Sequence, residues 1–137
     1  MPVTINASPS NGLVQTADGS GILKVQSNGV TTNALAWVNF DGTSASPITP
    51  RANYNVSSVT KNATGDYTLN FTNALTDANF VLVGNCLSSN TGTTRGFLSN
   101  SSATSYTPST SSARFATIAA GVGNTDYQYI YCAVFGN

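Results

Sequence analysis

The side chains of this chain that are most able to do chemistry are its aspartates, because the sequence contains neither histidine nor glutamate. Without histidine, nucleophilic catalysis of the Ser–His or Cys–His type is excluded. Two carboxylates about 5 to 9.5 Å apart could cleave a glycosidic bond, so a polysaccharide depolymerase with paired aspartates stays an alternative. The aspartates nevertheless lie beside glycines or in connections between strand-like runs, as turn residues do. We therefore expect turn or loop roles, and no catalytic residue, among Asp18, Asp41, Asp66, Asp77 and Asp126.

The sequence predicts neither a metal site nor a cofactor. No loop carries more than one carboxylate, whereas a calcium site needs several. Cys86 and Cys132 cannot form a zinc site without histidine or further cysteines. Each cysteine lies in an apolar strand-like run, which favours two buried thiols. A disulfide is the alternative, if the two strands are neighbours.

The chain is almost uncharged, since five Lys and Arg residues balance five aspartates and Ser, Thr and Asn dominate the polar residues. A net charge of zero gives no electrostatic attraction for nucleic acid. No run approaches the roughly 18 apolar residues of a membrane span, so we expect no membrane insertion. A neutral surface of hydroxyls and amides suits work outside a cell or in a rigid assembly. It also suits contact with the hydroxyl groups of sugars.

Aromatic residues are candidates for stacking on sugar rings, which present an apolar C–H face. Trp37 lies in the middle of a strand-like run, and Tyr127, Tyr129 and Tyr131 alternate along the last such run. In both places a position in the core or in a subunit interface is the preferred interpretation, with sugar stacking as the alternative. Tyr106, in a polar loop, fits either role.

The elements that must position these side chains are β-strands. Ser, Thr and Asn favour strands and turns over helix interiors, and the usual residues of exposed helices are scarce. Tyr67, Leu69 and Phe71 alternate with polar residues, which is the period of a half-buried antiparallel strand. We expect an all-β chain of about eight to ten strands without a helix, arranged as an antiparallel β-sandwich.

The stretch from residue 54 to residue 84 shows the strand pattern most clearly. It predicts a hairpin whose turn places Gly65 in a left-handed conformation. Val56 and Val59 have opposite parity, so a bulge between them is needed to turn both inward. The apolar run at 80–83 predicts a strand that is covered on both faces.

Two segments of the sequence together resemble a known family. AWVNFDGT (36–43), followed by RANYNVSSVTKNATGDYTLNFTNALTDANFVLVG (51–84), resembles the C-terminal, receptor-binding tip domain of many bacteriophage tail fibre proteins. Residues 16–35 resemble the short repeats that lead into such tips. The similarity weakens after Gly84, and Ala63 stands where the family usually has glycine. The matched residues are structural ones, so no ligand-binding residue carries over from the family.

The resemblance implies a domain division and an assembly. Residues 1–33 alternate short apolar pieces with turns and cannot bury a core alone. We expect them to form an extended N-terminal arm or the end of a fibre shaft, and residues 34–137 to form the sandwich of the tip. The family implies a homotrimer, which would also cover the aromatic last strand.

The function that the resemblance implies is attachment of a virion, outside the cell, to a host surface receptor. We expect a bacterial cell-surface glycan, bound without catalysis. A depolymerase and a purely structural virion module, for fibre trimerisation or capsid decoration, are the alternatives. Loop position and side-chain type select the candidate contact residues Asn90, Thr93, Arg95, Tyr106, Asp126 and Tyr127.

Overall fold

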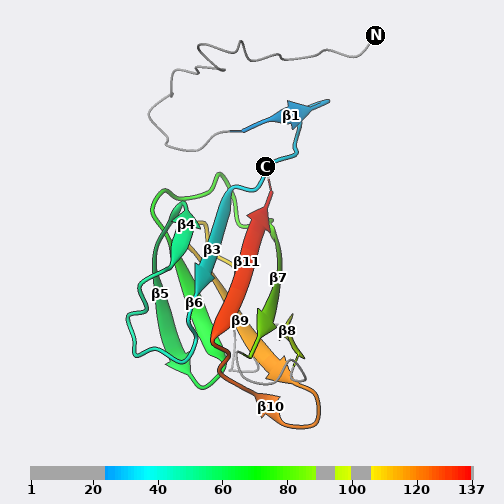
Figure 1. The fold of residues 1–137 in the computed structure, drawn as a ribbon. Coiled ribbons are helices and arrows are strands. Elements are labelled where there is room, and N and C mark those ends of the chain that lie inside the picture. The colour runs from blue at the N-terminus through cyan, green and yellow to red at the C-terminus, as the bar shows by residue number, and fades with distance from the viewer. Residues whose placement is uncertain (1–23, 89–94, 100–105, 137) are drawn as a thin grey trace, which may run out of the picture.

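The computed structural model of the chain describes residues 24–88, 95–99 and 106–136, and of residues 95–99 it describes the backbone only. Within these residues the chain forms strands and connections and contains no helix (Figure 1). The predicted all-β class is therefore confirmed for the part that the structure describes. The division into an N-terminal arm and a tip stays a prediction, since residues 1–23 lie outside that part.

Eleven strands are described, eight of which are three residues or longer. They are β1 (Gln26–Ser27), β2 (Val30–Thr31), β3 (Ala36–Phe40), β4 (Ala52–Tyr54), β5 (Val56–Ala63), β6 (Asp66–Phe71), β7 (Val81–Leu87), β8 (Arg95–Ser99), β9 (Ser112–Ala119), β10 (Gly123–Asn124) and β11 (Tyr129–Phe135).

The strands form two antiparallel sheets, a small one of β1 and β2 and a large one of nine strands. The large sheet has the order β4-β3-β11-β7-β8-β9-β6-β5, and β10 pairs with β9. It folds over on itself, so that β3, β11 and β7 lie in front of β9, β6 and β5 (Figure 1). This two-layered arrangement is compatible with the predicted β-sandwich.

The core lies between the two layers and is built around three aromatic rings. Phe40 on β3 contacts Tyr67 on β6 edge-on, with ring centroids 5.2 Å apart, and Phe115 on β9 lies 5.9 Å from Tyr67. Such pairs contribute about 0.5–1.5 kcal/mol each beyond the burial of their surface. Alternation along β3 and β11 sends Val38, Phe40, Ile130, Cys132 and Val134 into this core. The opposite side chains of these strands therefore point away from it.

The hairpin of β5 and β6 forms as the sequence predicts. Gly65 has a φ of +64°, in the left-handed region. The pairing register shifts between Val56 and Ser58, and this bulge lets both Val56 and Val59 lie buried. Each feature depends on local residues, which explains why the sequence reveals it.

The apolar run of β7 differs from its prediction. Val81 and Val83 are 60% and 46% exposed, and of the two faces of this strand only the one carrying Cys86 is buried. The run was expected to be covered on both faces, as strands of central parallel sheets are. Here the strand lies in an antiparallel layer, whose second face no described residue covers.

Cys86 and Cys132 lie on the neighbouring strands β7 and β11, on the inward face, and are thiols. They are 1% and 5% exposed, and burial beside Cys86 raises the pKa of the Cys132 thiol. Thiolate is the reactive form, so we expect neither group to react with Ellman's reagent in the folded protein. Both should react after unfolding in guanidinium without reductant. An unfolded chain without a reactive thiol would mean that the two cysteines form a disulfide.

Candidate ligand-binding face

The outward side chains of β3, β11 and β7 form a continuous sheet surface, called here the outer face. Its members are Trp37, Asn39, Val81, Val83, Asn85, Leu87, Tyr131, Ala133 and Phe135. Six of the eight large apolar side chains that are exposed in the described residues belong to it. Trp37 and Tyr131 are each 41% exposed. Contiguous exposed apolar surface of this kind marks a place where something binds.

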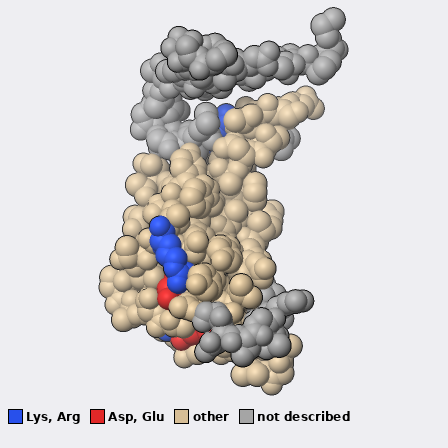
Figure 2. Space-filling model, viewed as in Figure 1, with Lys and Arg blue, Asp and Glu red and all other residues tan. Residues whose placement is uncertain are grey.

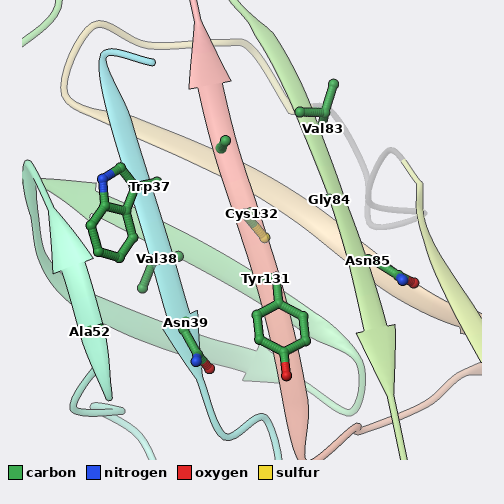
Figure 3. A pocket seen from close by; sticks show the side chains of 10 residues that line it. Trp37, Val38, Asn39, Ala52, Val83, Gly84, Asn85, Tyr131 and Cys132 are labelled. Atoms are coloured by element: carbon green, nitrogen blue, oxygen red, sulfur yellow. The ribbon is translucent and has the colours of Figure 1, made fainter. Parts of the chain in front are cut away.

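The register of the three strands decides which side chains of the outer face are neighbours. Ala133 on β11 pairs with Trp37 on β3 and with Val83 on β7. In the next row, Tyr131 pairs with Asn39 and with Asn85 in the same two directions. The aromatic rings of Trp37 and Tyr131 thus stand on adjacent strands, one row apart, as Figure 3 shows.

A hollow of about 480 Å³ opens on the outer face at this place (Figure 3). Ala133 is one of its lining residues, and its methyl group is much smaller than the side chains of Trp37, Tyr131 and Val83. The lining consists of Trp37, Val38, Asn39, Ala52, Val83, Gly84, Asn85, Tyr131, Cys132 and Ala133. Small-molecule sites are typically concave, mostly apolar and about 300–1,000 Å³ in volume, and the hollow fits this description.

Two amides, those of Asn39 and Asn85, contribute polar groups to the lining beside the indole N–H of Trp37 and the hydroxyl of Tyr131. The Oδ1 atom of Asn39 is buried and has no hydrogen-bond partner among the described residues. The Oδ1 atom of Asn85 accepts from the backbone N–H of Cys86 at 2.8 Å, which orients the amide. An unsatisfied buried acceptor costs about 1–3 kcal/mol, so a donor that reached Asn39 would be stabilised there.

Among the described residues, no charged side chain lines the hollow. Arg51, next in sequence to the lining residue Ala52, holds its guanidinium 4.6 Å from the ring centroid of Tyr129. The same guanidinium donates to the carbonyl oxygen of Gln128 (2.7 Å) and to Asp41 (3.1 Å), so its charge is paired. In Figure 2, most of the surface in view belongs neither to Lys or Arg (blue) nor to Asp or Glu (red).

The described aspartates have internal roles. Asp41 accepts from the N–H of Thr43 at 2.9 Å, and Asp77 accepts from the N–H of Asn79 at 2.7 Å, both as turn residues do. Asp66 lies instead within β6, where it is 3% exposed and accepts two hydrogen bonds from Arg114. Asp18 lies outside the described residues.

Asp126 links three segments of the chain at the end of the large sheet. Its carboxylate accepts from the ammonium of Lys61 (2.6 Å), the hydroxyl of Tyr67 (2.6 Å) and the backbone N–H of Gly65 (2.7 Å). Burial opposes the charged form, but these donors outweigh it and hold the pKa of Asp126 below its usual range. Burial and the neighbouring carboxylate raise the pKa of Tyr67. The carboxylate therefore has a structural role.

Comparisons with protein-family models, with curated proteins and with solved structures found no match to this chain. Among the described residues there is no group of side chains that could hold a metal ion. Nor does that part of the chain contain a helix long and apolar enough to cross a membrane.

The six predicted contact residues do not come together in the described structure. Asn90 and Thr93 lie outside the described residues, and Arg95 begins β8, with its side chain not described. Tyr106 is half-buried, and its hydroxyl lies 3.4 Å from the carbonyl oxygen of Ser112.

Asp126 and Tyr127 were candidates for ligand contact, and for Tyr127 the core was the preferred alternative. The carboxylate of Asp126 is occupied by the three donors named above. Tyr127 is 1% exposed, because its ring packs into the core ahead of β11. The side chain of Tyr127 is therefore withdrawn from the surface, while that of Asp126 stays 23% exposed.

The sequence left open whether Trp37 and Tyr131 lie in the core, in a subunit interface or at a ligand-binding surface. Both lie outside the core, while an interface with another chain stays a prediction. The alternation in AWVNF already indicated that Trp37 points outward. Val38 and Phe40 share one face of the strand, and that face is more apolar than the face that carries Trp37 and Asn39. The more apolar face of a strand is the one that the core takes.

Proposed function

We propose that this chain is the receptor-binding tip of a phage tail fibre, which attaches the virion to a bacterial cell-surface glycan without catalysis. The observation that carries the proposal is the outer face, where exposed aromatic rings and amides occur together without charge. Sugars offer the matching chemistry, because a pyranose has an apolar C–H face and a rim of neutral hydroxyls. The family resemblance of residues 36–84 supports the same function independently.

Attachment through such a face would depend on several weak sites acting together. A single neutral, solvent-exposed sugar site binds weakly, and multiple copies raise the overall affinity without any new contact. We therefore propose a homotrimer, in line with the family. Light scattering should give about 42 kDa, three chains of 14.1 kDa. A mass of one chain would contradict the trimer.

Binding of the fluorescently labelled chain to a panel of bacterial strains tests the function. We expect saturable binding to some strains, lost when their surface sugars are oxidised with periodate and kept when their surface proteins are digested. Polysaccharide extracted from a bound strain should be recovered at unchanged length after incubation with the chain.

Three outcomes would overturn parts of this proposal. If no strain binds the chain, the attachment function fails and a structural virion module is favoured. If protease treatment but not periodate abolishes binding, the receptor is a protein. Release of shorter fragments from the polysaccharide would favour an enzyme.

A further inference from the structure

We propose that the hollow between Trp37, Tyr131 and Val83 binds one uncharged pyranose residue of the receptor glycan, stacked against the two aromatic rings. The inference rests on the proposed function and deepens it, because it assigns recognition to the middle of a sheet. The loops after Gly84, where the sequence predicted the contacts, are then not required for it.

The spacing of the rings suits a single sugar. On adjacent antiparallel strands, side chains one row apart on the same face lie within reach of one another's aromatic groups. Trp37 and Tyr131 have this relation, and the methyl group of Ala133 leaves space between them. A sugar lying across β3 and β11 between the two rings would face Trp37, Tyr131 and Ala133, which all line the hollow.

The two amides supply the polar part of recognition. Asn39 and Asn85 flank Tyr131 on opposite sides, so they would meet hydroxyls at the two edges of a sugar lying near that ring. The Oδ1 of Asn39 has no partner but is buried, so it accepts from a sugar hydroxyl only once its amide turns toward the hollow. The NH₂ group of Asn85 is a donor whose amide is already oriented by Cys86. Hydroxyls donate and accept, and so match both.

The absence of charge in the lining selects against acidic sugars. A carboxylate moved from water into this hollow would lose hydration without gaining a cation, which is costly. Among the described residues, the guanidinium of Arg51 is already bound to Asp41 and Gln128. We therefore commit to a neutral hexose or N-acetylhexosamine. A second copy of the chain is a less suitable occupant, because it would have to satisfy both amides while filling a concave hollow.

The site can be followed directly, because Trp37 is the single tryptophan of the chain. The probe is polysaccharide from a strain that the labelled chain binds, with neutral and acidic methyl glycosides as competitors at millimolar concentrations. Tryptophan fluorescence should change saturably on addition of the polysaccharide, and neutral glycosides alone should reverse the change. Raising NaCl from about 0.05 to about 0.5 M should alter the Kd less than about twofold, because no ion pair is involved.

Variants of the full chain separate the site from the function. Tyr131→Ala keeps the tryptophan reporter and should weaken binding at least about tenfold, as should Trp37→Ala measured on cells. Tyr131→Phe keeps the ring and should bind nearly as the native chain does. Val122→Ala is the matched control, since Val122 is 77% exposed but lies away from the outer face.

Each of the following outcomes would overturn the proposed sugar site. If the native chain binds cells but both alanine variants bind equally well, the site is wrong and the proposed function stands. If Tyr131→Ala lowers the mass of an oligomer to that of one chain, the outer face is an interface between copies. If acidic glycosides compete best, the inferred ligand class is wrong. If the native chain binds no strain, the proposed function and this site fail together.

Discussion

Replacing Gly65 with alanine should destabilise the fold by about 3 kcal/mol or more, the sum of two costs at one position. The first is conformational, because a φ of +64° is strained for a residue with a Cβ atom. The second is steric. An added Cβ would meet the backbone nitrogen of Thr125 and would lie 2.8 Å from the carbonyl oxygen of Thr117.

These backbone atoms cannot move aside easily. The N–H of Thr117 donates to the carbonyl oxygen of Gly65 at 2.8 Å. The N–H of Thr125 donates to the carbonyl oxygen of Thr117 at 2.9 Å. Relief of the clash would therefore break the hydrogen bonds that hold the hairpin turn against the β9–β10 connection.

Gly121→Ala is the matched control for this prediction. Gly121 also has a positive φ, +76°, but an added Cβ would meet no atom within 4 Å. It should cost only about 1 kcal/mol, the conformational part. Guanidinium unfolding of both variants gives the comparison. Equal losses of stability would mean that the turn at Gly65 is not packed against Thr117 and Thr125.

Asp126→Ala should lower the free energy of unfolding by about 3 kcal/mol, because it leaves three donors without their acceptor. Lys61 would keep a largely buried positive charge, and the hydroxyl of Tyr67 would have to donate instead to the carbonyl oxygen of Gly42, 3.0 Å away. Asp41→Asn is the comparison, since its ion pair with Arg51 is more exposed and should be worth about 0–1 kcal/mol. Similar losses in the two variants would contradict the role assigned to Asp126.

The same carboxylate makes stability depend on pH. Its pKa is lower in the folded chain than the unfolded value of about 3.9, so the folded state favours the ionised form. The contribution of this carboxylate to folding stability is fully present above its pKa in the unfolded chain. It is lost as the pH falls through its pKa in the folded chain. The free energy of unfolding should therefore decrease below about pH 5, and Asp126→Asn should make this decrease shallower. An unchanged pH profile in Asp126→Asn would show that other groups cause it.

The sequence by itself determined the features of this protein that depend on neighbouring residues. The alternation of Tyr67, Leu69 and Phe71 specifies a strand with one buried face, and Gly65 specifies the turn that precedes it. The bulge follows from the opposite parity of Val56 and Val59. These residues lie close together in the chain, so the backbone conformations they favour can be read without knowing the fold.

Contacts between distant segments could not be read in the same way. The internal role of Asp126 could not be predicted from the sequence, because Lys61, 65 positions earlier, becomes its partner only when the two layers assemble. Asn55, between β4 and β5, has a positive φ of 54°, and its buried amide donates to the carbonyl oxygens of Leu35 and Asn73, which are also distant in sequence.

Only the tertiary structure decided the candidate site. Strands β3, β7 and β11 are far apart in sequence, so the alternation within each strand does not show that the three strands lie side by side. Once Phe40 and its neighbours pack against Tyr67 and Phe115, Trp37 and Tyr131 must point outward. The hollow then exists because β11 lies between β3 and β7, which places the small side chain of Ala133 between Trp37 and Val83.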